Sequence, residues 1–243
     1  MPSLPTVNLI WHDPKVLYPK APYNIVAPSN WAVMQFRRFY HQDAKYHQCI
    51  CIDVNVYKPL GETRNDRFLC VGRMGAEKGN LEAALLCKEL NVPLDIVTAS
   101  ETKAGEISDY AKRVMAVADG EKIKVWWEKD YTEESKIKMM QINKALLYTT
   151  THAEITSHKL QEALLCGQPV IVPKLGALPE IVTQGVDGYL CSSREDYIKA
   201  IREVDKLKPA KTYERLKQTY SIENVVKSNI LLYEKVKGGL RWR

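Results

Sequence analysis

Residues 67–90 read RFLCVGRMGAEKGNLEAALLCKEL, and this stretch decides the fold that we predict. An apolar run ends at Gly72, a loop containing glycine follows, and a helical stretch begins at Gly79. A strand that passes through a short loop into a helix is the first half of a βαβ unit. If the pattern repeats along the chain, the strands must form a parallel sheet, because such units connect parallel neighbours.

The pattern does repeat, as far as Lys206. Further short runs rich in β-branched residues occur at 94–99, 122–127, 145–150, 169–174 and 188–192. Helical stretches separate or follow them, at 79–90, 109–118, 132–143, around Glu162, near 178–184 and at 194–206. This alternation predicts an α/β fold with a doubly wound, parallel, six-stranded Rossmann-type sheet.

The first 58 residues contain a smaller α/β pattern. Strand candidates occur at 6–11, 23–29 and 48–53, and Ser29 is placed to cap a helix that follows it. This is too little chain for a full α/β domain, so we predict a reduced N-terminal α/β layer over residues 1–58. Residues 54–66, which contain Pro and Gly, are typical of a linker.

We place the Rossmann-like domain at residues 59–207 and C-terminal helices at 208–243. Within the last stretch, Ile222, Val226, Ile230 and Tyr233 share one side of a helix. An apolar stripe of this kind is typical of a helix that packs against another part of a protein. We therefore expect these four side chains to be covered.

Composition favours a globular protein without a membrane span. Hydrophobic residues make up 45% of the 243-residue chain and charged residues 26%. No apolar run reaches the ~20 residues of a transmembrane helix, and the N-terminus lacks the features of a signal peptide, so we expect a cytoplasmic location. The six cysteines form no C-x-x-C pair or zinc-ligand spacing with the five histidines, which indicates reduced structural thiols.

The net charge of +6 is unevenly distributed. Residues 1–60 carry +3 and residues 206–243 carry +7, which leaves the middle of the chain acidic. If the two ends meet, they form a cationic face that suits an anionic acceptor or a membrane surface. A solvated, lysine-rich helical surface would explain the same counts.

Two positive residues flank the loop after the first strand of the predicted sheet. Arg73 follows the strand directly and Lys78 opens the next helix. Ligands of open parallel sheets bind at the carboxyl ends of the strands, where helix N-termini add N–H donors for anions. The pair therefore suits a diphosphate, although solvated loop residues would give the same pattern.

Two glutamates, Glu154 and Glu162, follow the fourth strand with seven residues between them. If a helix begins near Thr156 or Ser157, unpaired backbone N–H groups lie between the two carboxylates. A carboxylate can accept both hydroxyls of a ribose while the N–H groups bind phosphate oxygens. A loop glutamate and a surface helix glutamate are the structural alternative. The segment PKLGALPE (173–180), after the fifth strand, is a third candidate at the same sheet edge.

Together these segments resemble the retaining glycosyltransferases of the GT-B fold, in the large family 4 group. The resemblance rests on residues 67–90 and 152–190, with NIVAPSNWAVMQF and CIDVNVYKP from the N-terminal region. It covers about residues 23–200, and implies a C-terminal domain that binds a nucleotide-diphospho-sugar. It also implies C-terminal helices that cross back to a shortened N-terminal acceptor domain.

The resemblance assigns roles to residues of this chain. Arg73 and Lys78 would neutralise the diphosphate, Glu162 would bind the ribose and Glu154 would contact the donor sugar. Backbone N–H groups from Ser157 to Leu160 would add to the phosphate site. The donor-binding set implied in this way comprises Gly72, Arg73, Lys78, Trp127, Glu154, Thr156, Ser157, His158, Lys159, Leu160 and Glu162.

The chemistry that the resemblance implies needs no metal or other cofactor. Arg73, Lys78 and the helix N-terminus can stabilise the leaving diphosphate, and the sequence contains no Asp-x-Asp motif. His12 occupies a place comparable to a family histidine that approaches the donor sugar, so it joins Glu154, Arg73 and Lys78 as a catalytic candidate. The chain departs from the family in its short N-terminal region and in having Ile155 and Thr156 after the first glutamate.

The sequence thus predicts a metal-independent glycosyltransferase that moves a sugar from a nucleotide donor to an unknown acceptor with retention. The alternative is a non-catalytic nucleotide-sugar-binding subunit that needs a partner chain, or a second copy, for the acceptor site. A GT-B epimerase or phosphorylase is a third interpretation, and the phosphorylase form would require a pyridoxal phosphate lysine, for which the sequence has no motif.

Overall fold

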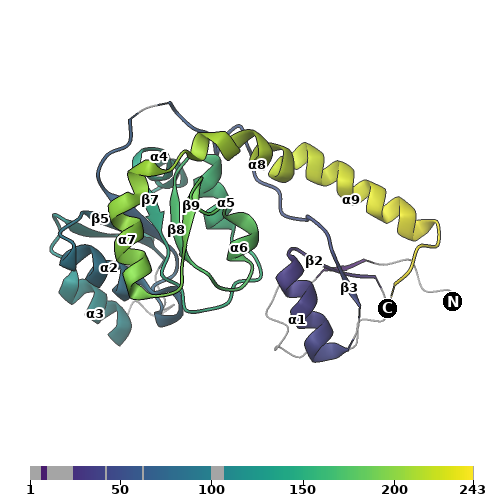
Figure 1. Ribbon diagram of the computed structural model, residues 1–243, viewed down its shortest axis with the longest axis horizontal. Coiled ribbons are helices and arrows are strands. Elements are labelled where there is room, and N and C mark those ends of the chain that lie inside the picture. The colour runs from purple at the N-terminus through teal and green to yellow at the C-terminus, as the bar shows by residue number, and fades with distance from the viewer. Residues whose placement is uncertain (1–6, 10–23, 42, 62, 100–106, 243) are drawn as a thin grey trace.

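The computed structural model describes residues 7–9, 24–41, 43–61, 63–99 and 107–242. These residues form an N-terminal lobe, made of β1–β3 and α1, and a larger second lobe, made of β4–β9 and α2–α8 (Figure 1). A long final helix, α9 (Ile222–Lys237), runs from the second lobe back to the first.

The second lobe is built on one six-stranded sheet. All its strands are parallel, in the order β6-β5-β4-β7-β8-β9. Their bounds are β4 Phe68–Val71, β5 Leu94–Thr98, β6 Ile123–Trp127, β7 Ala145–Leu147, β8 Val170–Pro173 and β9 Gly188–Cys191. The predicted doubly wound, six-stranded parallel sheet is confirmed.

Helices cover both faces of this sheet. One face packs against α2 (Asn80–Glu89), α3 (Asp109–Val117) and α7 (Arg194–Glu203). The other packs against α4 (Glu133–Ile142), α5 (His158–Leu165), α6 (Leu178–Ile181) and α8 (Tyr213–Tyr220). Phe68 and Cys70 of β4 belong to the first core, whereas Leu69 between them belongs to the second. Because both faces are buried, the strands are continuous apolar runs rather than alternating ones.

The N-terminal lobe is a parallel three-stranded sheet with one helix. Its strands β1 (Asn8–Leu9), β2 (Ile25–Ala27) and β3 (Ala44–Tyr46) lie in the order β1-β2-β3. The helix, α1, spans Asn30–Tyr40, and the Ser29 side chain accepts a hydrogen bond from the Ala32 N–H. The predicted cap is therefore confirmed.

The third strand of this lobe lies earlier than the sequence predicts. The expected strand at 48–53 is wrong, since β3 ends at Tyr46 and only an isolated bridge joins Ile52 to Ser221. Ile50 and Ile52 are nevertheless buried, in the core of the second lobe. Their alternation therefore reflects an extended segment with one side against the second lobe, which gives the same sequence pattern as a strand. Cys51 is exposed and Cys49 is half-buried, so neither makes the neighbouring-strand contact that such a strand would give.

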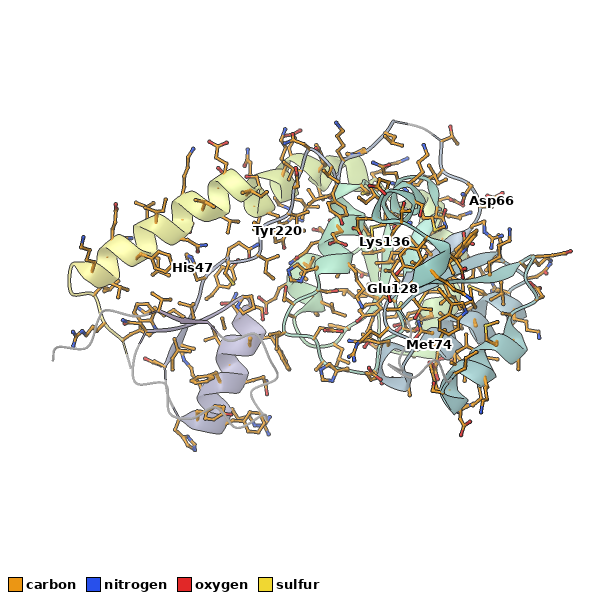
Figure 2. All side chains as sticks on the ribbon, turned by 180° about the vertical axis from the view of Figure 1, so that it is seen from behind. His47, Asp66, Met74, Glu128, Lys136 and Tyr220 are labelled. Carbon is orange, nitrogen blue, oxygen red and sulfur yellow. The ribbon has the colours of Figure 1, made fainter. Side chains whose placement is uncertain are left out.

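The linker is attached to the second lobe. The Arg64 guanidinium donates to the carbonyl oxygens of Met140, Asn143 and Cys166, at 2.8–3.0 Å. The Gln141 side chain donates to the Lys58 carbonyl oxygen. The chain crosses between the lobes beside Tyr220, whose carbonyl oxygen accepts from the Ile52 N–H (Figure 2).

The C-terminal segment joins the N-terminal lobe. Trp242 is 8% exposed and packs with Val26 and Val236, and its indole N–H donates to the Ile25 carbonyl oxygen at 2.8 Å. His47, beneath α9 in Figure 2, lies 2.7 Å from the Asn229 side-chain oxygen. The C-terminal helix therefore returns to the N-terminal lobe, as the resemblance implies.

The expected packing stripe of α9 is wrong. Ile222, Val226, Ile230 and Tyr233 are each 45–56% exposed. The helix instead contacts the N-terminal lobe through an adjacent side of its surface, which includes Leu232 and Val236. The helix sequence therefore contains two neighbouring apolar stripes. The position of the N-terminal lobe decides which of them is buried. Among the described helices, none has both the length and the hydropathy needed to cross a bilayer.

Replacing Trp242 with alanine should destabilise the attachment of α9. We expect the change to remove buried aromatic packing and leave the Ile25 carbonyl oxygen without its donor, lowering the free energy of unfolding by about 3 kcal/mol. Urea unfolding measures the loss, and hydrogen exchange at Ile25–Ala27 should show where it occurs. Leu240→Ala, at an exposed neighbouring position, is the control. Equal stability of the two variants would contradict the assigned packing.

Candidate functional site

The central strands β4 and β7 mark the switch point of the sheet. They are neighbours, and the strand order runs outward from them in opposite directions. Ligands of open parallel sheets bind at the carboxyl ends of the strands at such a point, so the candidate site is expected here. The loop 72–79 leaves β4 here and the segment 148–157 leaves β7.

Hydrogen bonds join these two segments. The Thr149 hydroxyl donates to the Gly79 carbonyl oxygen at 2.6 Å, and the Thr150 hydroxyl donates to that of Glu77 at 2.7 Å. Gly79 has a φ of +75°, and a Cβ atom there would lie 2.1 Å from the Thr149 carbonyl oxygen. Only glycine allows this approach, which sets Lys78 opposite the segment that carries Glu154.

Lys78 and Glu154 form the ion pair at the centre of the site. The Lys78 Nζ lies 2.8 Å from the Glu154 Oε1, and the two side chains are only 11% and 17% exposed. The Tyr148 hydroxyl, at the end of β7, donates a short hydrogen bond to the same carboxylate oxygen. Two residues predicted from distant parts of the sequence are thus in direct contact.

The protonation states follow from this contact. Burial alone would raise the pKa of Glu154, but the hydrogen bonds from Lys78 and Tyr148 outweigh burial and lower it. Burial and the neighbouring carboxylate raise the pKa of Tyr148, so the phenol keeps its proton. The site therefore holds an anionic Glu154 between an ammonium and a phenol.

The loop after β8 fixes the backbone of Glu154. The Ala177 N–H donates to the Glu154 carbonyl oxygen at 2.8 Å. Gly176 has a φ of +60°, and a Cβ atom there would lie 2.5 Å from that same oxygen. The segment PKLGALPE thus positions the first glutamate through its backbone, which the sequence alone did not indicate.

Arg73 is not part of the buried cluster. Its side chain is 72% exposed and its NH2 atom lies 3.4 Å from the Glu77 carboxylate, an exposed pair within one turn. Its charge acts on the nearby Lys159, whose pKa it helps to lower. The guanidinium is therefore close to the site and free of any buried ion pair among the described residues.

Glu162 lies in different surroundings from Glu154. Burial is the main cause that raises its pKa, and Lys136, Glu133 and His158 are the charged groups that act on it. Tyr57 of the linker donates to Glu133 at 2.6 Å. The two glutamates thus sit in separate polar clusters, Glu154 before α5 and Glu162 within it.

The first turn of α5 lies between these clusters. Ser157 is its N-cap residue, and the turn contains no acidic side chain. His158 is exposed, Leu160 is fully buried in the core, and Thr156 accepts from the Gln161 side chain at 3.2 Å. The first N–H groups of a helix have no partner within it, and an anion site at this turn stays a prediction.

The two tryptophans at the end of β6 have different partners. Trp127 is partly buried against the core beneath α2 and α3, and Trp126 donates its indole N–H to Asp95 at 3.0 Å. A base-stacking role for Trp127 stays a prediction. His12 lies outside the described residues. Within those residues, no group of three or more His, Cys, Asp or Glu is placed to hold a metal ion.

The lobes touch beside the site through two side chains of the second lobe. Ile155, which follows Glu154, is 8% exposed and packs with Ala27 and other core residues of the N-terminal lobe. The Glu180 carboxylate accepts from the backbone N–H groups of Asn30 and Trp31 at 2.9 and 2.7 Å. The sequence analysis did not identify Tyr148, for which a tyrosine at the end of an apolar strand was the signal. It included Glu180 only as the last residue of the candidate segment 173–180 and gave that side chain no role.

These features define a two-lobed α/β protein with a cluster of charged side chains at the switch point of its larger sheet. Comparison with protein families matches residues 58–220 to the model described as glycosyl transferases group 1. The match spans more than half of the chain, so the protein belongs to the group 1 glycosyltransferases. The comparison with curated proteins gave no match.

Solved structures show the same fold. AviGT4, a glycosyltransferase involved in avilamycin A biosynthesis, has a TM-score of 0.75 at 18% identity, over 98% of this chain and 69% of that one. A glycosyltransferase from Rickettsia africae has a TM-score of 0.74 at 14% identity, over 89% and 64%. Anabaena Alr3699/HepE, solved with UDP and glucose, has a TM-score of 0.69 at 20% identity, over 89% and 63%. The chain therefore spans about two thirds of the length of these neighbours.

Removing the Lys78 ammonium should show how much it stabilises the ionised Glu154 side chain. We expect Lys78→Met to lower the free energy of unfolding at pH 7 by about 2 kcal/mol, because it leaves a largely buried carboxylate without its cation. Adding Glu154→Gln should recover part of this, giving a coupling energy of about 1 kcal/mol in a double-mutant cycle measured by chemical denaturation. The folded-state pKa of Glu154 lies below its unfolded value, so the coupling should disappear as the pH falls through the folded value.

The exposed pair of Arg73 with Glu77 provides the control for this cycle. Such pairs contribute about 0–1 kcal/mol, so Arg73→Met should change stability little. Additive losses for Lys78→Met and Glu154→Gln would show that the two side chains do not interact.

Replacing Glu162 with glutamine should stabilise the protein at neutral pH. The raised pKa means that the ionised Glu162 side chain is less favourable in the folded chain than in the unfolded one. This lowers the free energy of unfolding. The loss is absent in acid, where the carboxyl is protonated in both states, and is complete above the folded-state pKa. We expect Glu162→Gln to raise Tm by about 1–3 °C at pH 7.5 relative to its effect at pH 4, measured by calorimetry.

Glu134→Gln is the matched control, since Glu134 is an exposed residue of α4 whose pKa is lowered by hydrogen bonds from its own backbone N–H and from the Thr132 side chain. A stabilisation that is the same at both pH values, or shared by the control, would show that burial of Glu162 is not the cause.

Proposed function

We propose that this chain is a glycosyltransferase that transfers a sugar from a nucleotide-diphospho-sugar to an acceptor. Membership of group 1 supports the class of reaction. The observation that carries the proposal is the buried Lys78–Glu154 pair at the switch point, next to the first turn of α5. One neighbour of the same fold, Anabaena Alr3699/HepE, was solved with UDP, with UDP-glucose, and with UDP and glucose.

Each part of the donor has a counterpart in this arrangement. Cationic side chains, with Arg73 and Lys78 foremost, and the N–H groups of α5 face the diphosphate. Glu154 faces the sugar, and Glu162, on the other side of the turn, accepts the ribose hydroxyls. Negative charge develops on the diphosphate as the glycosidic bond breaks, and preorganised cations stabilise that charge.

The proposal includes retention of configuration, family 4-like character and independence of metal. Lys and Arg side chains can balance the leaving diphosphate as a divalent cation does in other enzymes. We expect EDTA to leave the transfer rate unchanged, and NMR to show the same anomeric configuration in donor and product. We also propose a cytoplasmic enzyme, and an acceptor that is anionic or lies at a membrane surface, because both ends of the chain are basic.

The acceptor-side alternative rests on the size of the N-terminal lobe. Its described residues form only three strands, and the chain covers 64% or less of several neighbours. One neighbour, at a TM-score of 0.65 and 13% identity, was solved as the GtfA/B complex. A chain that binds donor but transfers sugar only when a partner subunit or a second copy is present would fit this alternative.

A thermal-shift screen of UDP-, GDP- and ADP-sugars tests the proposal. A ligand of the native state at 100 times its Kd adds about 2.7 kcal/mol, which corresponds to a rise in Tm of about 5–10 °C for a chain of this size. The donor that gives this shift is then incubated with the chain, and release of nucleoside diphosphate is measured. Glu162→Gln should weaken the shift, and Lys88→Met, on the exposed side of α2, should not. No shift with any of these donors would refute donor binding.

A further inference from the structure

Lys159 is a half-buried cation beside the central ion pair. It is the second residue of α5, and its Nζ lies 4.5 Å from the centre of the Tyr148 ring and 3.4 Å from the Tyr148 hydroxyl. The same nitrogen lies 3.1 Å from the point where a side chain at Gly72 would begin. The ammonium thus lies between the ends of β4 and β7.

The charges around Lys159 do not balance. Lys78 is paired with Glu154 at 2.8 Å, and Tyr148 donates to the same carboxylate. Among the described residues, no carboxylate oxygen lies within 4.0 Å of the Lys159 Nζ. Burial, followed by the repulsion of Lys78, lowers the pKa of Lys159. Glu154 attracts the ammonium and offsets part of this repulsion, and among the described residues Tyr148 is its only hydrogen-bond and ring partner. A partly desolvated ammonium in such surroundings is stabilised when an anion joins it.

A second observation points to an anion at the same place. Ser157, the N-cap residue of α5, is 4% exposed, and its hydroxyl has no hydrogen-bond partner in the part of the chain that the structure describes. It does not cap the helix, although a serine at this position usually bonds the N–H groups of the first turn. Those N–H groups and the Lys159 ammonium come from the same turn.

We propose that the Lys159 ammonium binds a phosphoryl oxygen of the donor diphosphate, as a third cation beside Arg73 and Lys78. This inference rests on the proposed function and goes further by giving each of the three cations a different role. Lys78 holds the Glu154 carboxylate, Arg73 is available from solvent, and Lys159 meets the phosphate from the buried side. The bound phosphate balances a charge that the protein itself leaves unpaired.

Gly72 has a place in this arrangement. Its backbone is in an ordinary conformation, so glycine is needed there only because the Lys159 ammonium lies close. Gly72→Ala would push the end of the flexible lysine aside by a few tenths of an ångström without breaking the backbone. The variant should therefore weaken phosphate binding in the same direction as a change of Lys159, but less.

The affinity of the chain for a nucleoside diphosphate and for its nucleoside tests the proposal. UDP, GDP and ADP are tried first, and calorimetry then compares the diphosphate that binds with its nucleoside. Lys159→Met should raise the Kd for the diphosphate at least tenfold, leave that for the nucleoside within about twofold, and leave Tm equal or higher, because methionine fills the site without a charge. Lys88→Met, an exposed lysine of α2, removes the same charge and should change neither Kd.

The outcomes separate this inference from the function on which it rests. If the unmodified chain binds a diphosphate and Lys159→Met binds it equally well, the inference is wrong and the proposed function stands. If Lys159→Met weakens diphosphate and nucleoside alike with a lower Tm, the lysine has a structural role and the inference is also wrong. If the unmodified chain binds none of the three diphosphates, both proposals fall together.

Discussion

The site depends on one electrostatic contact, the pair that Lys78 and Glu154 form at the carboxyl ends of β4 and β7. The two residues are 76 positions apart, and they meet because β4 and β7 are adjacent in the sheet. The approach requires Gly79, whose missing side chain lets the loop after β4 touch the segment after β7. A parallel sheet whose order reverses at its centre therefore brings these charges together at one point of its edge.

Contacts between the lobes bear on the same glutamate. Ile155, the residue next to Glu154, packs in the core of the N-terminal lobe. The Glu180 carboxylate accepts hydrogen bonds from the N–H groups of Asn30 and Trp31 at the start of α1. Trp242 then fastens the far end of α9 to β2. Among the described residues, contacts beside the site and along α9 thus help to fix the orientation of the small lobe, so a shift of that lobe would act on the backbone of Glu154.

Residue patterns predicted the larger lobe better than the smaller one. Six apolar runs separated by helical stretches leave few topologies for a parallel sheet, because each crossover must be right-handed and cover one face. The N-terminal lobe offers no such repetition. Ile50 and Ile52 alternate with polar residues as a strand would, yet they pack on the second lobe, and the stripe from Ile222 to Tyr233 lies at the surface of α9. A short apolar pattern does not indicate which part of the protein buries its residues.

The sequence by itself determined the class of fold, the order of its elements, and the loops on which a cation pair and a glutamate pair lie. It could do so because hydrophobic periodicity and the residues at strand ends are local properties. Only the tertiary structure decided which of these groups meet. It paired Lys78 directly with Glu154 and added the Tyr148 hydroxyl to the same carboxylate. It left Arg73 in solvent, set Glu162 in a separate cluster and placed the half-buried Lys159 without a carboxylate in ion-pair contact. Such choices depend on distances between segments remote in sequence, which no local pattern encodes.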